Sequence, residues 1–334
     1  MSGLFVQKHV EAVRARGVDV RVITATEAEE IVPQWRRLQE EHWMPDLVQV
    51  NVLQKQVLLA RTLLRKEHIP FIIVEHWSGY LPQNGQFMRQ NWFKRRFYRR
   101  VAREASMILT VSHPLQQAMR DCGFEAKKWG TIDNVVDDFF YRQKTASLKD
   151  KRQKTKTLLH VSCFDEKAKN VKGLLRAAKM LSEKRKDWRL RLVGTGIDYQ
   201  EVRAYAQSLD IPEGLLEWTG ELTPLQVADE MHRADALVLS SRYETYGVVL
   251  AEAVAAGLPI LSTPVGIAEE LADLIVPQEI AQYHPGKFAE FIETILWNRP
   301  TPNAQKPKTK DRFTADFIGQ KLVSIYDSCL HSDI

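Results

Sequence analysis

Cysteines are scarce in this chain, and long apolar runs are missing. Only three of the 334 residues are cysteines. They form neither a Cys-x-x-Cys pair nor a cluster with histidine, so nothing in the sequence indicates a zinc site or a disulfide scaffold. Sparse, isolated thiols are typical of a reducing compartment, and we expect a cytoplasmic protein. No apolar run reaches the roughly 18 residues that a membrane-spanning helix needs.

Several nucleotide-binding and metal-binding motifs are missing as well. There is no Gly-Lys-Ser/Thr phosphate loop, which argues against a phosphate-loop nucleotidase. Gly194-x-Gly196 is followed by Tyr199 where a dinucleotide fingerprint has its third glycine, so support for NAD is weak. We interpret the two glycines as a tight strand-to-helix turn that faces a nucleotide. No Asp-x-Asp pair lies in a suitable loop, and we expect neither a catalytic metal nor a cofactor.

The length and the charge of the chain narrow the alternatives further. A chain of 334 residues exceeds the roughly 250–300 residues of one hydrophobic core and suits two domains. The net charge of +5 and the pI of about 9.0 favour an anionic partner. That partner is a nucleotide, a phosphate, an acidic membrane surface or a nucleic acid. Charge alone is almost as compatible with a basic protein that has no such partner.

Short β-rich runs alternate with helical patterns in the first half of the chain. We predict buried parallel strands at residues 18–25, 46–52, 70–76 and 106–112. We predict helices at residues 4–16, 53–67 and 113–123, of which the first and the last are ended by glycine. A strongly basic stretch without apolar period, residues 144–156, follows and is interpreted as a linker or an exposed excursion.

The alternation resumes after this basic stretch. We predict strands at residues 157–162, 190–194, 215–220, 236–240 and 259–262. We predict helices near residues 170–185, 198–209, 224–233 and 247–256. Two such alternations predict an α/β protein with two facing, doubly wound Rossmann-like domains and a cleft between them.

The domain boundaries follow from the same pattern. We assign residues 1–150 to the first domain, residues 151–310 to the second, and residues 311–334 to a C-terminal helix that packs near the domain junction. The chain opens with a helix, whereas a doubly wound domain opens with a central strand. We therefore expect that the first strand of the N-terminal domain is missing and that this domain is truncated.

Two glutamates eight residues apart, Glu244 and Glu252, stand out in the stretch "SRYETYGVVLAEAVAAG". Eight helical steps would leave their side chains about 80° apart, so they do not form a simple surface pair. Gly247 opens a helix between them, and the first-turn amides, from Tyr246 through Val249, lack helical acceptors. Such amides favour a phosphate. If the diphosphate of a sugar nucleotide lies at this end of the helix, Glu244 lies in the loop on the side of the transferred sugar. Glu252 lies five residues past Gly247, about 7.5 Å along the helix axis, and can reach the ribose.

The stretch from Ser241 to Gly266, "SRYETYGVVLAEAVAAGLPILSTPVG", resembles the signature of retaining GT-B glycosyltransferases of family 4. Their pattern is S-R-x-E-x-x-G-x-x-x-x-E-A-x-A-x-G-x-P, and every specified position matches. The resemblance extends over nearly the whole chain, through "LHVSCFDEKAKNVKGLLRA", "LRLVGTG" and "WTGEL" in the second half. In the first half it is carried by "IIVEHW", "LTVSHPL" and "IDNVVD".

The resemblance implies roles for individual residues. Glu244 would contact hydroxyls of the transferred sugar, and Glu252 would hold the ribose. Lys169 would neutralise the diphosphate, although Lys167 and Lys172 compete for that role. Gly247 and the amides after it would cradle the phosphates. His76 would lie across the cleft near the reacting sugar, and Gly3 would belong to the glycine loop after the missing strand.

One position departs from the family pattern. Members often carry an arginine in the strand that leads to the lysine, and this chain has Cys163 there. The site therefore lacks the arginine that would bind the diphosphate together with Lys169, unless Lys167 or Lys172 compensates or the alignment is shifted by a few residues. We expect Cys163 to be a small buried residue and not a nucleophile.

The resemblance implies a metal-independent hexosyltransferase. It would move a sugar, with retention, from a nucleotide-diphosphate sugar to a hydroxyl of a glycan or glycolipid acceptor, as in cell-surface polysaccharide biosynthesis. A sugar-nucleotide epimerase or hydrolase of the same fold is one alternative. A non-catalytic subunit that binds a sugar nucleotide is the other.

The segment from Phe87 to Ala105 combines seven arginines and lysines with five aromatic residues. Three interpretations compete. The first is a solvated helix whose aromatic side chains are buried. The second is a peripheral contact with the inner membrane surface, suited to a lipid-linked acceptor. The third, nucleic-acid binding, is the least favoured because no recognition module accompanies the charge.

Overall fold

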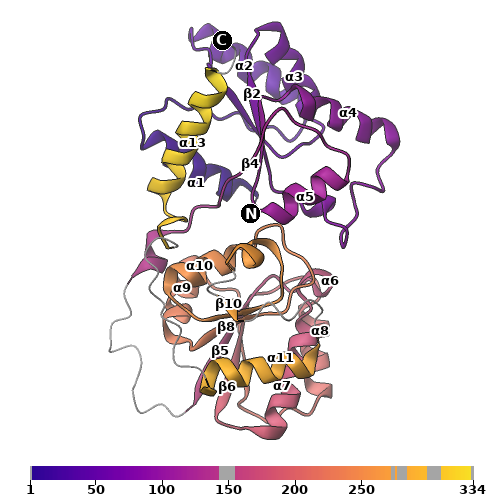
Figure 1. Cartoon of the computed structure of the whole chain (residues 1–334), viewed down its shortest axis with the longest axis vertical. Coiled ribbons are helices and arrows are strands. Elements are labelled where there is room, and N and C mark those ends of the chain that lie inside the picture. The colour runs from indigo at the N-terminus through magenta and orange to yellow at the C-terminus, as the bar shows by residue number, and fades with distance from the viewer. Residues whose placement is uncertain (1, 143–154, 272–274, 277–283, 299–309, 332–334) are drawn as a thin grey trace. The chain divides into compact units, whose positions relative to one another are not determined.

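The computed structural model describes the chain except for residues 1, 143–154, 272–274, 277–283, 299–309 and 332–334 (Figure 1). It divides into two compact units. Unit 1 comprises Met1–Val135 and Phe313–Ile334, and unit 2 comprises Val136–Arg312. The boundary between the units thus falls before the one we drew at residue 150, and the predicted linker at residues 144–156 lies mostly outside the described residues. The C-terminal helix is part of unit 1.

Unit 1 contains a four-stranded parallel sheet in the order β1-β2-β3-β4. The strands are β1 Val48–Asn51, β2 Phe71–Glu75, β3 Met107–Thr110 and β4 Trp129–Thr131. The helices are α1 Ser2–Arg14, α2 Ile31–Glu40, α3 Val57–Lys66, α4 Trp92–Glu104, α5 His113–Asp121 and α13 Ala315–Leu330. The three predicted helices and three of the four predicted strands are confirmed.

Both faces of this sheet are covered. Each connection along the sheet runs in the same direction, so right-handed crossovers place α3, α4 and α5 on one face. Helices α1 and α13 pack together on the other face (Figure 1). There Ile72 and Leu109 of the sheet share a buried core with Ala12 and Ile318. The sequence explains this core, because β2 is apolar at four successive positions and buried throughout.

The strand predicted at residues 18–25 is wrong. This segment forms no ladder, and β1 pairs only with β2 among the strands that the structure describes. Two of its carbonyls instead accept hydrogen bonds from side chains. Arg14 donates to the carbonyl of Val20 (2.6 Å), and Gln34 donates to that of Thr24 (2.8 Å). An apolar run predicts burial of one face, but a strand also needs a neighbouring backbone to pair with.

Unit 2 contains a six-stranded parallel sheet in the order β10-β9-β8-β5-β6-β7. The strands are β5 Lys156–Val161, β6 Trp188–Val193, β7 Leu216–Gly220, β8 Ala236–Leu239, β9 Ile260–Ser262 and β10 Ile275–Val276. The helices are α6 Glu166–Lys169, α7 Val171–Lys184, α8 Tyr199–Ser208, α9 Pro224–Arg233, α10 Val248–Ala256 and α11 Pro285–Glu293. All five predicted strands and all four predicted helices are confirmed, and β10, α6 and α11 were not predicted.

The strand order of unit 2 reverses between β5 and β8. From β5 the chain proceeds to β6 and β7, whereas from β8 it proceeds to β9 on the other side. The helices consequently divide, with α7 and α8 on one face of the sheet and α9 and α10 on the other (Figure 1). The chain therefore continues from β5 and from β8 toward opposite sides of the sheet. Doubly wound sheets bind their ligands at this point.

Candidate active site

The loops that follow β5 and β8 bring two oppositely charged side chains into contact. Lys169 is the last residue of α6, and its Nζ lies 2.6 and 2.8 Å from the two carboxylate oxygens of Glu244. Ser241 donates a hydrogen bond to Oε1 of the same carboxylate at 2.8 Å. The side chains of Lys169 and Glu244 are only 16% and 12% exposed. The two residues that the sequence singled out separately thus form one largely buried ion pair.

The pair keeps Lys169 charged. Burial acts to lower the pKa of Lys169, but the adjacent Glu244 carboxylate outweighs it and raises that pKa above its ordinary value. The site therefore holds a permanent ammonium group at neutral pH, next to an acceptor of three hydrogen bonds. A charged group held in this way can bind a phosphate, and a carboxylate can bind sugar hydroxyls.

Asn170 and Arg242 hold the two loops together. Asn170 has a left-handed backbone (φ 52°) between α6 and α7. Its side chain donates to the carbonyl of Ser240 (3.1 Å) and accepts from the Arg242 guanidinium (2.8 Å). The Arg242 amide donates to the carbonyl of Ala168 (2.7 Å), and its guanidinium also contacts Glu166. Arg242 is thus committed to loop structure, which sequence reasoning did not foresee.

Helix α10 begins directly after the Glu244 loop. Gly247 precedes it with φ 80°, and a Cβ there would lie 2.9 Å from the Leu250 side chain, so glycine fits both the backbone and the space. Tyr246 is buried, and its carbonyl accepts from the Ile267 amide at 2.9 Å. This fixes the position from which Val248 starts the helix.

Glu252 lies on α10 and is partly exposed, in the second turn of the helix. It belongs to the same helix whose first amides follow Glu244, as the motif predicted. The roles of Gly247, Tyr246, Val248 and Glu252 in holding a donor stay predictions.

Gly194 and Gly196 are required by close packing of two loops. A Cβ at Gly194 would lie 2.0 Å from the Ser162 carbonyl oxygen, and one at Gly196 would lie 2.5 Å from the Phe164 amide nitrogen. The Phe164 amide in turn donates to the carbonyl of Thr195 (3.0 Å). The glycines therefore bring the turn after β6 against the loop that leads to Lys169. Their contact with a nucleotide stays a prediction.

The prediction that Cys163 is buried is wrong. Its free thiol is exposed in the loop between β5 and α6. Loop residues after a strand end face solvent or a ligand, and the strand before Cys163 ends at Val161. Of the competing lysines, Lys172 pairs with Glu201 at 2.5 Å and Lys167 is exposed. Only Lys169 of the three meets the Glu244 carboxylate.

A buried histidine lies beneath this edge of the sheet. His160 Nδ1 donates to the carbonyl of Val238 at 2.9 Å, which leaves Nε2 to accept from the Ser162 hydroxyl at 2.8 Å. Burial lowers the pKa of His160 to about 4, against the hydrogen bond to Val238, and nearby Lys169 contributes in the same direction. His160 is therefore neutral at physiological pH, and it ties β5 to β8.

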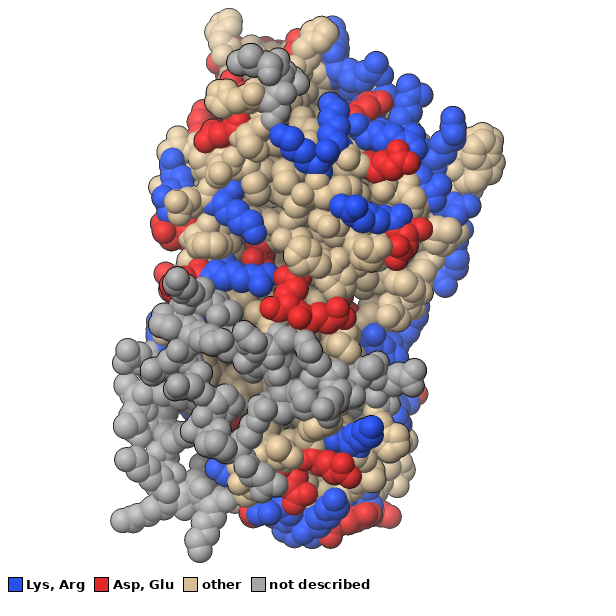
Figure 2. All heavy atoms as spheres, in the orientation of Figure 1, with Lys and Arg blue, Asp and Glu red and all other residues tan. Residues whose placement is uncertain are grey.

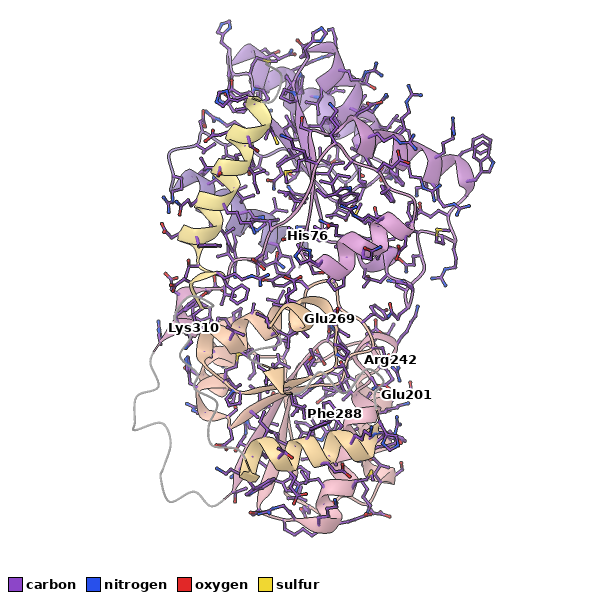
Figure 3. All side chains as sticks on the ribbon, in the orientation of Figure 1. His76, Glu201, Arg242, Glu269, Phe288 and Lys310 are labelled. Carbon is purple, nitrogen blue, oxygen red and sulfur yellow. The ribbon has the colours of Figure 1, made fainter. Side chains whose placement is uncertain are left out.

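His76 and Gly3 both lie in unit 1. His76 follows β2 and is labelled in Figure 3. Its ring stacks on Phe5, and burial together with the neighbouring His9 lowers its pKa to about 3. Gly3 lies in the first turn of α1, so its assignment to a loop is wrong. The structure shows helix from Ser2 onward. A role of His76 opposite the donor stays a prediction.

Among the residues that the structure describes, no group of three His, Cys, Asp or Glu side chains is placed to hold a metal ion. Likewise, none of the described helices is long and apolar enough to cross a membrane.

The arrangement can be compared with known proteins. The family model described as "Glycosyl transferases group 1" matches residues 142–312, which include Lys169, Glu244 and α10. The chain belongs to this glycosyl transferases group 1 family. A second model, "Glycosyltransferase Family 4", matches residues 28–138. The fold of this group 1 chain is GT-B, as the resemblance predicted.

Two curated relatives of this group 1 chain have known activities. It is 27% identical over 195 residues to the lipopolysaccharide 1,6-galactosyltransferase of Escherichia coli (strain K12), covering 58% of this chain and 52% of the relative. It is 30% identical over 239 residues to the N-acetyl-alpha-D-glucosaminyl L-malate synthase of Bacillus anthracis, covering 67% and 59%. The chain thus spans between half and three fifths of the length of these relatives.

Solved structures share the fold at lower identity. The Anabaena protein Alr3699/HepE, in complex with UDP-glucose, aligns with a TM-score of 0.71 and 20% identity over 96% of this chain and 88% of that one. The sucrose-phosphate synthase of Thermosynechococcus elongatus aligns with a TM-score of 0.74 and 16% identity over 98% and 93%.

Proposed function

We propose that this chain is a retaining glycosyltransferase that moves a hexose from a nucleotide-diphosphate sugar to a hydroxyl group of a glycan or glycolipid. The observation that carries the proposal is the Lys169–Glu244 ion pair at the topological switch point, directly in front of α10. A sugar nucleotide needs a cation for its diphosphate and an acceptor for its sugar hydroxyls, and this pair supplies both within one contact. Family membership and the activities of the two curated relatives support the same reaction class.

In the proposed mechanism the ion pair exchanges partners when the donor binds. The Lys169 ammonium turns to the diphosphate together with the first amides of α10, and the Glu244 carboxylate accepts hydrogen bonds from the sugar. Glu252 holds the ribose. As the bond between the sugar and the phosphate breaks, Lys169 and the helix amides stabilise the charge that develops on the leaving group.

The acceptor hydroxyl then attacks the sugar on the face that the phosphate leaves, so the configuration at the anomeric carbon is retained. The departing phosphate takes the proton of that hydroxyl. This route uses no metal ion and no protein carboxylate as a base. We propose that His76 contacts the reacting sugar. The site lies on the inner side of the cell membrane in this proposal, where nucleotide sugars are made and lipid-linked acceptors are presented.

A panel of labelled UDP-, GDP- and ADP-sugars tests the proposal, with and without a mixture of lipid-linked and free glycan acceptors. We expect one donor to yield a glycosylated product in the presence of EDTA, with the anomeric configuration of the donor by NMR. Free sugar as the main product would indicate a hydrolase, and an altered sugar still linked to nucleotide would indicate an epimerase. Donor binding without any product would indicate a non-catalytic subunit.

A further inference from the structure

Helix α4 has one face in the core of unit 1 and a second face that the proposed reaction does not use. Tyr98, Val101 and Ala102 are buried. On the opposite side, Trp92 and the five arginines of the helix lie within about 140° of one another at 100° per residue. Helix α4 holds six basic residues and one acidic residue. The exposed face is therefore strongly cationic.

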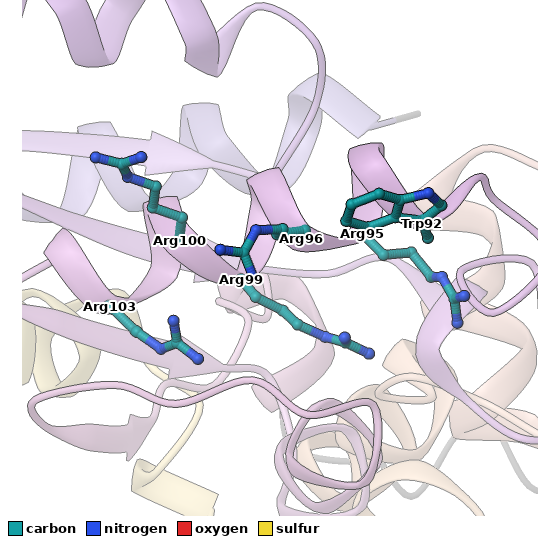
Figure 4. Close-up of a pocket in the computed structure, with 6 residues that line it drawn as sticks. All are labelled: Trp92, Arg95, Arg96, Arg99, Arg100 and Arg103. Carbon is teal, nitrogen blue, oxygen red and sulfur yellow. The ribbon is translucent and has the colours of Figure 1, made fainter.

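The arginines of this face surround a hollow of about 430 Å³. Its lining, drawn in Figure 4, consists of Trp92, Arg95, Arg96, Arg99, Arg100 and Arg103. In the space-filling view the blue side chains gather along the edge of unit 1 that carries α4 (Figure 2). Several guanidinium groups that line one hollow are suited to phosphate, which they bind through paired N–H donors.

The arginines are weakly neutralised by protein carboxylates. Arg100 lies 3.5 Å from Glu104 and Arg103 lies 2.9 Å from Glu125, and both arginine side chains are more than half exposed. Exposed pairs of this kind are weak and exchange readily for another anion. Arg99 is held differently, because its Nε donates to the carbonyl of Cys122 at 2.8 Å. The face thus has cationic groups available to a ligand.

Two aromatic side chains are exposed at the beginning of the same helix. Trp92 is 55% exposed and Phe93 is 68% exposed, and Met88 just before the helix is 51% exposed. The rings of Trp92 and Phe93 stack at 3.9 Å between centroids. One of the three interpretations that the sequence left open was a solvated helix whose aromatic side chains are buried. Trp92 and Phe93 do not fit it, because both are exposed. Exposed large apolar side chains beside a basic face are typical of helices that lie in a membrane interface.

We propose that this face of α4 docks on a bilayer that contains anionic phospholipids. Lipid phosphates occupy the arginine hollow, and Trp92 and Phe93 insert at the boundary between headgroups and acyl chains. A soluble polyanion would use the arginines and leave the rings in water. Because the two rings stack on each other, they offer fewer free faces to a nucleobase. The proposal deepens the proposed function, on which it rests only for the lipid-linked nature of the acceptor.

Flotation with vesicles tests the docking. The full chain is mixed with vesicles of phosphatidylcholine alone or with about 30% phosphatidylglycerol, at about 0.1 M salt, where exposed charges are screened beyond about 10 Å. We expect flotation with the anionic vesicles only, weakening as salt increases. Heparin and a single-stranded oligonucleotide serve as soluble polyanions in parallel.

Three variants separate the contributions. The ring variant is Trp92→Ala/Phe93→Ala. The charge variant is Arg96→Ala/Arg100→Ala/Arg103→Ala. The control, Arg176→Ala/Lys184→Ala/Arg233→Ala, removes the same charge from exposed positions of unit 2. We expect the charge variant to lose about 100-fold in vesicle affinity and the ring variant about tenfold, and the control to bind as the wild type does.

Circular dichroism and donor binding check that each variant is folded, and both are expected to be unchanged. The docking proposal would be overturned if the wild-type protein binds heparin or the oligonucleotide but does not bind the anionic vesicles. Equal losses in the charge variant and the control, or full vesicle affinity in the ring variant, would overturn it as well. None of these outcomes depends on transfer of a sugar, so the docking can fail while the proposed reaction stands.

Discussion

The carboxyl edges of the two sheets hold their charged groups in opposite ways. In unit 2, Lys169 and Glu244 meet as an ion pair whose carboxylate is bound by side chains. In unit 1, the Glu75 carboxylate is completely buried and bound mainly by backbone amides. It accepts from the amides of His76 and Trp77 at 2.9 Å each and from that of Leu53 at 3.1 Å. The Tyr80 hydroxyl donates the fourth bond at 3.2 Å.

This difference separates a charge that can change partners from one that cannot. Side chains such as Lys169 can rotate toward a ligand, whereas backbone amides stay where the fold puts them. Burial raises the pKa of Glu75 and lowers that of His76. At the edge of unit 1 it therefore acts against the charged form of both residues. The edge of unit 2 is therefore the one equipped for a diphosphate, whereas burial at the edge of unit 1 opposes charge on both Glu75 and His76.

The largest expected effect is on transfer. Replacing Lys169 with methionine removes the cation that stabilises the leaving diphosphate and leaves Glu244 without its partner. We expect the rate of transfer to fall about 1,000-fold, at the upper end of the loss of one transition-state contact. The matched control is Lys172→Met, because Lys172 pairs with Glu201 and not with Glu244. Equal losses in the two variants would remove the distinction between these lysines.

The second effect is on stability against pH. The pKa of His160 is lowered to about 4, against about 6.5 in an unfolded chain. Between these values the unfolded chain takes up a proton that the folded chain does not, so the folded state loses stability as the pH falls. The loss amounts to about 3 kcal/mol by pH 4. Urea unfolding of wild type and His160→Gln at pH 7 and pH 4 measures it, and parallel pH dependence of the two would contradict the assignment.

The third effect tests the edge of unit 1. Glu75→Gln keeps an oxygen for the amides of His76 and Trp77 but presents an NH₂ group to the Leu53 amide. A buried donor facing a donor costs about 2 kcal/mol of the free energy of unfolding. We expect donor affinity to be unchanged, since Glu75 serves the fold. The control Glu41→Gln changes an exposed glutamate. A Glu75 variant with wild-type stability and weakened donor binding would reverse the comparison.

The smallest expected effect distinguishes the roles of the two motif glutamates, Glu244 and Glu252, in donor binding and turnover. Glu252→Ala removes the contact with the ribose, and we expect donor affinity to fall about tenfold, as for one charged hydrogen bond. Glu244→Ala is expected to lower turnover more than binding, because its contact is with the transferred sugar. Calorimetry and initial rates on both variants decide this. Wild-type binding and turnover in both would refute the assignment of the motif.

Much of the α10 side of this site could be predicted from the sequence because its parts lie in one signature. The helix after Gly247 and the two glutamates follow from local spacing, and the parallel strands follow from their apolar runs. The contact between Lys169 and Glu244 could not be predicted from spacing, since the two are far apart in the chain and meet only through the pairing of β5 with β8. The family resemblance did point to both residues, to Glu244 through the signature and to Lys169 through the segment that contains it.

Other features depend on tertiary contacts that no local pattern encodes. Asn170 takes a left-handed backbone and joins two loops, and Arg242 is committed to that junction. The apolar alternation at residues 18–25 is genuine, but no described strand lies beside it to complete a ladder. Cys163 follows an apolar strand by two residues and is nevertheless exposed. Local periodicity predicts burial within an element and does not extend past its end.

Hydrogen exchange measured by mass spectrometry, with and without the donor that the panel selects, tests the central claim most directly. The claim is that the donor binds at the carboxyl edge of the unit 2 sheet, between the Lys169 loop and α10. We predict that the donor slows exchange in peptides covering residues 163–172 and 240–252, and that Lys169→Met abolishes this protection. Protection confined to other segments, or full protection in the variant, would contradict the account.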